Sequence, residues 1–208
     1  MPKVRARPAE LSPAKREQIL EGARRAFTEH GYERASVDLV AARAGVSKAT
    51  VYNHFQDKRA LFTAALLDVT AQVRRRIDEV LAAPTGDAAR DLQRVGEQFL
   101  GAVVAPTAVA LHRCLVSEAG RFPELGKALF EHVACTMKQS MAAYLGRLHE
   151  AGALRVEDPE LASRQFLALC QVDLVIQCQL GVTQAPSARV IRASVAGAVR
   201  TFLRAYRP

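Results

Sequence analysis

The sequence predicts an all-α protein of about nine helices, and three observations lead to that expectation. Half of the 208 residues are apolar and 24% are charged, which is the balance of a folded globular chain. Between Pro13 and Pro84 there is no further proline, and the glycines are limited to Gly22, Gly31 and Gly45. Apolar residues recur at intervals of three and four over most of the chain, and no segment alternates with the two-residue period of a strand.

A helix-turn-helix is predicted over residues 36–55. Ser36 and Ser47 are each suited to cap a short helix, because a serine side chain accepts hydrogen bonds from free backbone amides. Gly45 stands between the two helices and permits a sharp turn that a β-carbon would hinder. A longer helix, expected from residue 12 to about residue 30, precedes them.

The second helix of this motif is predicted to face DNA. If Val51 points into the core, a rotation of 100° per residue turns small, polar and aromatic side chains outward. Short side chains allow close approach to the major groove, where threonine, asparagine and an alanine methyl group read base edges. An ordinary solvated helix face is the alternative, but DNA contact is the better interpretation. The outward set is Lys48, Ala49, Thr50, Tyr52, Asn53 and His54.

Positive charge is concentrated near the N-terminus. Residues 1–60 hold 12 Lys and Arg against 7 Asp and Glu, a net charge of +5 out of the total of +8. This excess points to a polyanion as the partner of the N-terminal part. Residues 1–10 are expected to form a flexible basic arm, in which Lys3, Arg5 and Arg7 either follow a DNA backbone or only keep the chain soluble.

A long helix is predicted from the capping residue Asp57 to about Ala82. Its apolar residues form one stripe, and its length of roughly 37 Å suffices to leave a small N-terminal domain and enter a second one. Prolines and glycines then divide the remaining sequence into helical segments. These are expected near residues 87–103, 107–120, 124–150, 159–180 and 188–206.

Three stretches in the N-terminal part form a specific set: ILEGARRAFTEHGYERAS, AARAGVSKATVYNHF, and Asp57-Lys58 followed by Leu61-Phe62. In this order they resemble the DNA-binding domain of the tetracycline repressor (TetR) family of bacterial transcription regulators. The resemblance implies an all-helical homodimer, with a helix-turn-helix DNA-binding domain and a helical ligand-binding and dimerisation domain. We expect a boundary after the arm at residue 10, a DNA-binding domain over residues 11–56 and the second domain over residues 57–208.

Residue roles follow from the resemblance by position. It implies phosphate contacts for Ser36, Tyr52, His54 and Lys58. It implies approach to the bases for Lys48, Ala49, Thr50 and Asn53. Residue 36 is serine where threonine is commoner in the family, and the base preference does not carry over. Residues 111–131 also resemble the C-terminal domain of a branch associated with efflux-pump and stress genes.

The C-terminal helices carry candidates for a ligand pocket and a dimer seam. A pocket needs an apolar lining with a few orienting polar groups, and the pocket candidates are Phe99, Val103, Leu115, Met137, Met141, Phe166, Leu169, Cys170 and Asp173. Apolar stripes on the last helices could form a four-helix seam between two copies. Its candidates are Leu167, Leu174, Val175, Cys178, Ile191, Val195, Val199 and Phe202. Both sets could instead fill the core of a single chain.

No catalytic residue, cofactor or metal site is predicted. The sequence contains no GxSxG, HExxH, GxGxxG or P-loop motif, and its four cysteines form no CxxC pair. A redox sensor at Cys170 or Cys178 is a minor alternative to buried structural thiols. No run of 18 apolar residues or export signal occurs, so the sequence predicts a cytoplasmic protein without a membrane partner.

The sequence therefore predicts a homodimeric transcriptional repressor that binds a palindromic operator in double-stranded DNA. A small apolar or amphipathic effector is expected to release it, and the regulated gene is expected to serve efflux or stress. The alternative is a DNA-binding protein of structural or activator type without small-molecule induction.

Overall fold

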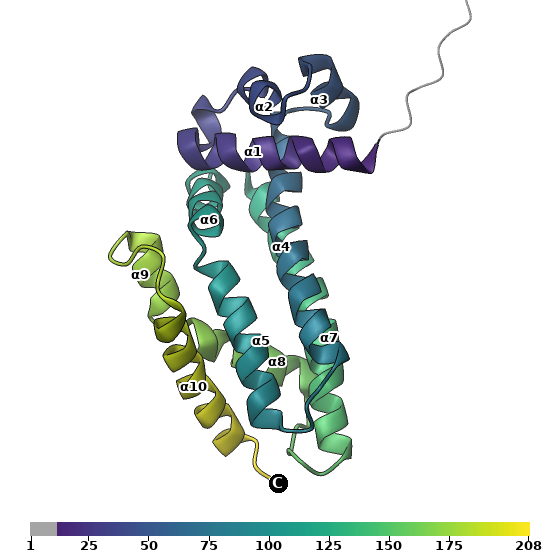
Figure 1. Ribbon diagram of the computed structural model, residues 1–208, viewed down its shortest axis with the longest axis vertical. Coiled ribbons are helices and arrows are strands. Elements are labelled where there is room, and N and C mark those ends of the chain that lie inside the picture. The colour runs from purple at the N-terminus through teal and green to yellow at the C-terminus, as the bar shows by residue number, and fades with distance from the viewer. Residues whose placement is uncertain (1–11) are drawn as a thin grey trace, which may run out of the picture. The chain divides into compact units, whose positions relative to one another are not determined.

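The fold is all-α, as the sequence predicts. The computed structural model describes residues 12–208, apart from the side chains of residues 129 and 132–138, so the basic arm over residues 1–10 lies outside the described residues. Within the described part there are helices and no strands (Figure 1). The helices are α1 (Pro13–Arg34), α2 (Val37–Ala44), α3 (Lys48–His54), α4 (Lys58–Ala82), α5 (Ala88–Val103), α6 (Pro106–Ala119), α7 (Pro123–Glu150), α8 (Pro159–Gln171), α9 (Leu174–Leu180) and α10 (Ala188–Ala205).

The starts of the N-terminal helices agree with the predicted caps. The Ser36 side chain accepts a hydrogen bond from the Leu39 amide at 3.1 Å, and Asp57 accepts one from the Ala60 amide at 2.7 Å. Gly45 adopts a left-handed conformation at φ 62° after α2, which is the conformation that its place in the turn requires. Local capping chemistry thus fixes where α2 and α4 begin.

The expected helix over residues 159–180 is two helices in the structure. Asp173 takes a left-handed φ of 59°, which breaks the chain between α8 and α9. Cys170, Leu174 and Cys178 are nevertheless all buried, so the apolar period continues across the break. Because the period is unbroken, the sequence pattern did not reveal the break, and the expected count of about nine helices is too low.

The chain divides into two compact units, and the division falls inside α4, between Asp68 and Val69. The expected division after residue 56 lies before α4. The difference arises because the first turns of α4 belong to the core of the first unit. The Phe62 ring lies 4.9 Å from the Phe27 ring and 5.0 Å from the Tyr32 ring.

The second unit has its own apolar core, to which each helix from α4 to α10 contributes. Phe166 and Phe202 pack edge to face at its centre, with ring centroids 5.3 Å apart. Helix α5 lies beside α10, where Gly96 faces Val195 (Figure 1).

Among the described residues no single helix is long and apolar enough to cross a membrane. Helices α5 and α6, bent by 60° relative to each other, together meet the length and composition of a membrane span.

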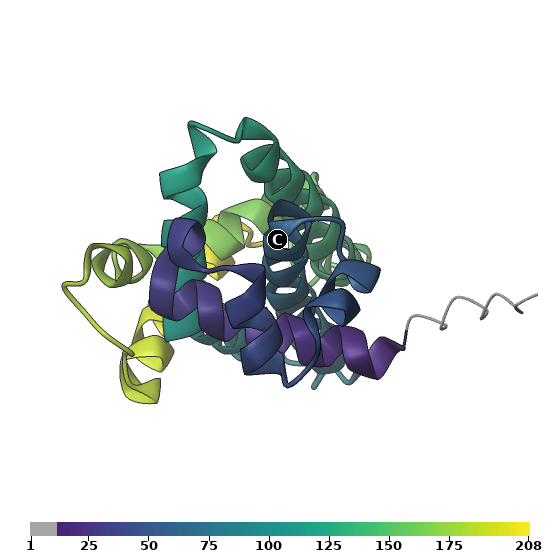
Figure 2. The same ribbon diagram turned by 90° about the horizontal axis from the view of Figure 1, so that it is seen from above.

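In the first unit, α1 supports the helix-turn-helix through a close backbone approach. Helices α2 and α3 lie on one side of α1, as Figures 1 and 2 show. A β-carbon added at Gly22 would lie 2.7 Å from the Ala44 β-carbon and 2.8 Å from the Ala44 backbone nitrogen. The Gln18 side-chain amide also donates to the Ala44 carbonyl at 2.6 Å. The glycine on α1 therefore sets how closely α2 packs.

Replacing Gly22 with alanine is expected to destabilise the protein by up to about 2 kcal/mol. The gain in helix propensity is about 1 kcal/mol, whereas the new methyl group must push α2 backbone away at a typical overpacking cost of about 1–3 kcal/mol. Urea unfolding measures the change in free energy. Gly126→Ala in α7 is the matched control, because nothing lies within 4 Å of the added β-carbon. Equal or greater stability of Gly22→Ala would contradict the close approach.

Candidate nucleic-acid interface

One side of helix α3 is buried, and its first turn is capped by Ser47. Val51 and Phe55 are buried, which fixes the inward side of the helix. The Ser47 side chain accepts the Thr50 amide at 3.1 Å and also lies 2.8 Å from the Thr50 hydroxyl. The Thr50 hydroxyl is therefore partly engaged in the cap. A rigidly anchored short helix of this kind can present its outer side to a partner.

The outer side of α3 carries the side chains that the helical rotation predicts there. Tyr52 is 48% exposed, a high value for a tyrosine. Thr50 and His54 are half-buried at its margins. The remaining exposed side chains are Lys48, Ala49 and Asn53. Their orientation permits contact with DNA, and the individual contacts stay predictions.

The two flanking candidates are held by contacts within the chain. Ser36 is exposed, and its hydroxyl caps α2. The Lys58 ammonium donates to the Glu33 carbonyl at 2.9 Å and lies 4.5 Å from the centre of the Tyr32 ring. These contacts place the positive end of the Lys58 side chain beside the loop that precedes α2.

Lys48 has an internal partner that the sequence analysis missed. Its ammonium lies 2.9 Å from the Asp38 carboxylate, so the first turns of α2 and α3 are joined by an ion pair. The hydrogen bond that Lys48 donates to the Asp38 carboxylate raises the pKa of Lys48 above its usual value. No short sequence pattern reveals this pair, because the two residues are ten positions apart and meet only through the turn between α2 and α3.

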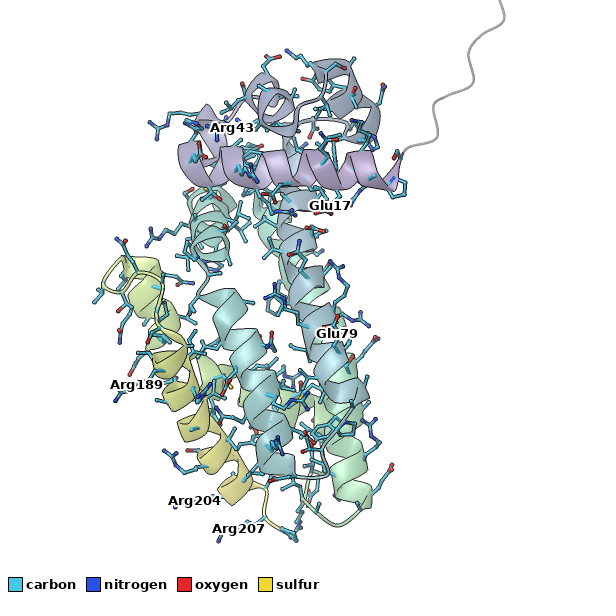
Figure 3. The ribbon with its side chains drawn as sticks, viewed as in Figure 1. Glu17, Arg43, Glu79, Arg189, Arg204 and Arg207 are labelled. Carbon is cyan, nitrogen blue, oxygen red and sulfur yellow. The ribbon has the colours of Figure 1, made fainter. Side chains whose placement is uncertain are left out.

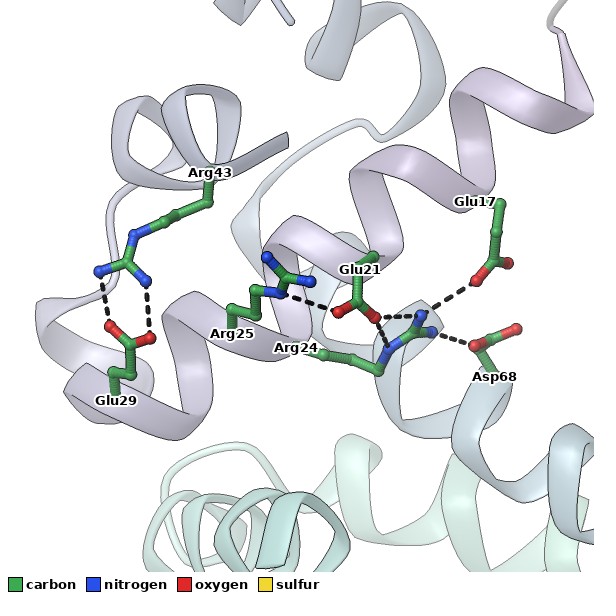
Figure 4. A network of polar contacts seen from close by, with 7 residues as sticks. All are labelled: Glu17, Glu21, Arg24, Arg25, Glu29, Arg43 and Asp68. Atoms are coloured by element: carbon green, nitrogen blue, oxygen red, sulfur yellow. Dashed lines mark hydrogen bonds and ion pairs between the residues drawn. The ribbon is translucent and has the colours of Figure 1, made fainter. Parts of the chain in front are cut away.

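A buried arginine joins α1 to α4 (Figure 4). Arg24 is 8% exposed and forms an ion pair with Asp68 on α4. It also binds Glu21 at 2.7 Å and Glu17 at 3.0 Å, both on α1. Burial alone would lower the pKa of Arg24, but the hydrogen bonds that Arg24 donates to Glu21 and Glu17 outweigh burial and raise the pKa. This cluster ties the start of α4 to the helix beneath the helix-turn-helix.

A second ion pair, also drawn in Figure 4, links α1 to the end of α2. Arg43 donates to the Glu29 carboxylate at 2.6 Å, and both side chains are exposed. This hydrogen bond lowers the pKa of Glu29. The domain therefore neutralises several of its cations internally.

Two family models match the chain. Residues 90–208 match the C-terminal domain of AefR-like transcriptional repressors, and residues 19–65 match the bacterial regulatory proteins of the tetR family. The first match alone covers more than half of the chain. The chain belongs to the TetR family. This is a family of transcription regulators and not of enzymes.

Relatives of this TetR-family chain show where the likeness is strongest. The transcriptional repressor AcnR of Corynebacterium efficiens is 42% identical over 64 residues, which are 31% of this chain and 34% of that protein. The match thus spans about a third of the length of that relative. A TetR-family structure from Mesorhizobium loti is 26% identical and superposes with a TM-score of 0.86 over 98% of this chain and all of that one.

A third similar protein is the flavonoid-responsive regulator FrrA. It is 28% identical and superposes with a TM-score of 0.71 over 95% of this chain and 99% of that one. The fold likeness therefore extends over both units of the chain.

The predicted ligand residues lie in several environments within the second unit. Phe99, Met141, Phe166 and Cys170 are buried in its core, and Val103 and Leu169 pack against that core. Leu115 is buried on α6, outside this cluster. Asp173 is exposed at the break between α8 and α9, and its side chain does not cap α9. The side chain of Met137 lies outside the described residues.

One buried polar group in this region was not singled out from the sequence. The Ser163 hydroxyl on α8 is fully buried and forms no hydrogen bond with the described part of the chain. Phe166 follows on the same helix and is also fully buried. A serine within a helical sequence gives no pattern that distinguishes a buried hydroxyl without a hydrogen-bond partner from one that has a partner.

The predicted seam residues face the core of their own chain. Ile191, Val175 and Leu167 are partly buried against it. The others are buried within it: Leu174, Cys178, Val195, Val199 and Phe202. The outward side of α9 instead exposes Ile176 and Leu180, which are 50% and 72% accessible.

The described cysteines are not joined in disulfides. Cys170 is fully buried, and burial raises the pKa of its thiol to about 12. Cys178 is also buried, Cys114 is half-buried, and the side chain of Cys135 lies outside the described residues. A thiol with a raised pKa is a poor nucleophile, which weighs against Cys170 as a redox sensor.

The ion pairs of Arg24 predict an acid-dependent stability. The hydrogen bond from Arg24 lowers the pKa of Glu21 below its usual 4.5. A carboxylate with a depressed folded-state pKa stabilises the fold at pH above its unfolded pKa and loses this effect as the pH falls through the folded value. We therefore expect Glu21→Gln to be less stable than the parent at pH 7, and the difference to shrink from pH 5 to pH 3.

Urea unfolding followed by circular dichroism at pH 7, 5, 4 and 3 measures this difference. Arg24→Gln should show the same direction of pH dependence, because it removes the other partner of these ion pairs. It leaves Glu17, Glu21 and Asp68 without their shared cation, so its deficit should be largest at pH 7 and smaller when the carboxylates are protonated. A stability difference for Glu21→Gln that does not change with pH would exclude the ion pair as its cause.

Proposed function

We propose that this chain is a homodimeric repressor that binds a palindromic operator through α2, α3 and the start of α4. The observation that carries the proposal is the outer face of α3, where an exposed tyrosine stands beside small and polar side chains on a helix capped by Ser47. The match of residues 19–65 to the tetR family model and the 42% identity to AcnR in this region support it. In this assignment Tyr52, His54, Ser36 and Lys58 contact phosphates, and the outward residues of α3 approach the bases.

The effector in this proposal is a small apolar or amphipathic molecule. The supporting feature is the second-unit core around Phe99, Met141 and Phe166, which supplies an apolar lining. Ser163 adds a buried hydroxyl with unused hydrogen-bonding capacity. An aromatic effector with a hydroxyl group fits this mixture, and the likeness to a flavonoid-responsive regulator is consistent with that class. The proposed target is an efflux or stress gene, on the resemblance of residues 111–131.

Induction follows in this proposal from the sharing of α4 by both units. Leu61 and Phe62 on α4 are buried in the first unit, and Val73 and Ile77 are buried in the core of the second. An effector that favours a different packing of that core acts on the same helix that begins at Lys58. The coupling is a difference in effector affinity between the operator-binding and the released states.

The dimer seam in this proposal uses the outward side of α9 rather than the buried stripes. Ile176 and Leu180 lie four residues apart on one side of α9. Val172 at the preceding break and Val182 after the helix are also exposed, at 57% and 73%. An apolar row of this size on the surface marks an interaction site. Helix α10 is less suitable, because it carries the exposed residues Arg192 and Arg200. It also carries the exposed residues Arg189 and Arg204, which Figure 3 labels.

DNA from upstream of the gene is expected to bind the protein specifically. We expect tight binding at 50 mM salt, preference over a scrambled duplex, and a loss of about 10³–10⁵ in affinity at 200 mM salt for 6–10 phosphate contacts. Tyr52→Ala should weaken operator binding at least about fivefold, since it removes a hydrogen bond of about 1 kcal/mol. Fluorescence anisotropy measures each of these values.

Arg204→Ala on α10 is the control for this experiment. It removes a charge from the second unit and should leave operator affinity unchanged. Equal affinity for operator and scrambled DNA would favour a DNA-binding protein of structural type. Specific binding that raises transcription in a purified system would favour an activator.

Substitution of the α9 row is expected to convert the dimer into monomers. Ile176→Asp and Leu180→Asp each place a charge in a contact that would be desolvated between two copies. Size-exclusion chromatography with light scattering measures the mass. The control is Phe130→Asp on α7, which also charges a highly exposed apolar position. A dimer that persists in both α9 variants would rule out this seam.

A further inference from the structure

The first turns of α2 and α3 present one acid and one base side by side. Asp38 lies in the first turn of α2 and Lys48 is the first residue of α3. Their side chains are 66% and 52% exposed, and Lys48 Nζ lies 2.9 Å from Asp38 Oδ2. Their neighbours Ser36 and Ala49 are both residues for which DNA contact is proposed. The pair therefore stands at the edge of the proposed DNA-binding face.

Stability does not account for this pair. Two exposed side chains in contact gain little, because water screens the charges and both side chains lose rotational freedom. An aspartate in the first turn of a helix is favoured by the helix dipole on its own, whereas a lysine at that place is disfavoured. Asp38 thus offsets the unfavourable interaction of the Lys48 ammonium with the positive end of the α3 dipole. A lysine at this unfavourable position is explained if its ammonium contacts a partner outside the chain.

We propose that Asp38 and Lys48 together read one G·C base pair in each half-site, with Asp38 as a specificity-determining residue. The inference rests on the proposed DNA-binding function. In the major groove guanine offers the N7 and O6 acceptors, and cytosine offers the N4 amino donor beside them. The ammonium donates to the guanine and the carboxylate accepts from the cytosine. Guanine O6 and cytosine N4 are themselves hydrogen-bonded at about 2.9 Å, which matches the separation of the two side-chain groups.

The same pair disfavours other partners. With the ammonium on the N7 atom of an adenine, the carboxylate would face the O4 acceptor and methyl group of the thymine, and neither offers it a hydrogen bond. On the reversed T·A pair the ammonium can reach thymine O4 and the carboxylate can reach adenine N6, but the thymine methyl group stands where guanine offers N7, so the ammonium loses its second acceptor. On DNA without the operator, Asp38 cancels the charge of Lys48 and repels phosphates. The carboxylate therefore lowers affinity for all DNA and restores it where a G·C pair occupies the contacted position.

Selection from a randomised duplex library with the intact protein tests the inference. The parent protein is expected to enrich a palindrome with a G·C pair at one symmetric position in each half-site. Asp38→Ala and Lys48→Ala should both lose the preference at that position, which for one base pair amounts to roughly 5- to 150-fold. Anisotropy titrations with duplexes that differ only at that pair measure the loss.

Non-operator DNA supplies the second readout. Asp38→Ala should bind scrambled duplex more tightly than the parent, and its slope of log affinity against log salt should steepen by about one phosphate contact. Glu29→Ala is the matched control, because it removes a carboxylate from the other exposed ion pair of this domain, with Arg43. The control should keep the base preference. Thermal unfolding of each variant shows that the fold is retained.

The outcomes separate the two levels of the argument. If the parent enriches no sequence, the proposed function fails and this inference fails with it. If the parent enriches an operator but Asp38→Ala keeps the same preference at every position, the inference alone is overturned. It is also overturned if Asp38→Ala and Lys48→Ala alter different base pairs, or if Glu29→Ala relaxes the preference as much as Asp38→Ala does.

Discussion

The close approach of α1 and α2 at Gly22 is the constraint on which the DNA-binding unit depends. The backbone of α2 lies so close to Gly22 that a β-carbon on residue 22 would be 2.8 Å from the Ala44 nitrogen. Because α2 is held at this distance, the turn at Gly45 and the capped start of α3 follow in fixed positions. The position of α3 thus depends on the absence of a side chain at Gly22 of the supporting helix α1.

Charge in this unit is organised by internal pairing as much as by net excess. Arg24 is held by carboxylates of α1 and α4, and Lys48 and Arg43 each have an acidic partner. The first 60 residues hold 12 Lys and Arg against 7 Asp and Glu, and several of these cations already have a carboxylate partner within the described part of the fold. If such a surface binds DNA, side chains such as Lys48 and Arg43 must leave a carboxylate partner to contact the DNA. In the proposed operator complex, Asp38 competes with phosphates for Lys48 on any DNA and finds a donor of its own only at a suitable base pair.

In the second unit, the same helical spacing of apolar residues is compatible with packing inside one chain and with packing between two copies. The stripes on the last helices were candidates for a seam between copies or for the core of a single chain, and in the structure they pack into the core of the second unit. The apolar residues left outside, such as Ile176 and Leu180, lie on the opposite side of α9. Periodicity shows that a helix has an apolar side. It does not show whether that side packs against its own chain or another one.

The sequence by itself determined the fold class, the helix starts and the helix-turn-helix. These features depend on local chemistry: Ser36 and Asp57 cap helices, Gly45 permits a left-handed turn, and the apolar spacing defines the buried side of each helix. The outward orientation of Tyr52 followed from the same spacing.

Tertiary structure alone decided the features that join distant segments. The ion pair of Arg24 with Asp68 spans 44 residues of sequence, and the first turns of α4 join the first core through Phe27 and Phe62. The break at Asp173 was equally hidden, because the residues around it keep their helical spacing. Asp38 and Lys48 meet only because the turn brings two helix starts together. Local propensity acts within a few residues, whereas pairing across the fold depends on the relative placement of whole helices, which no short pattern encodes.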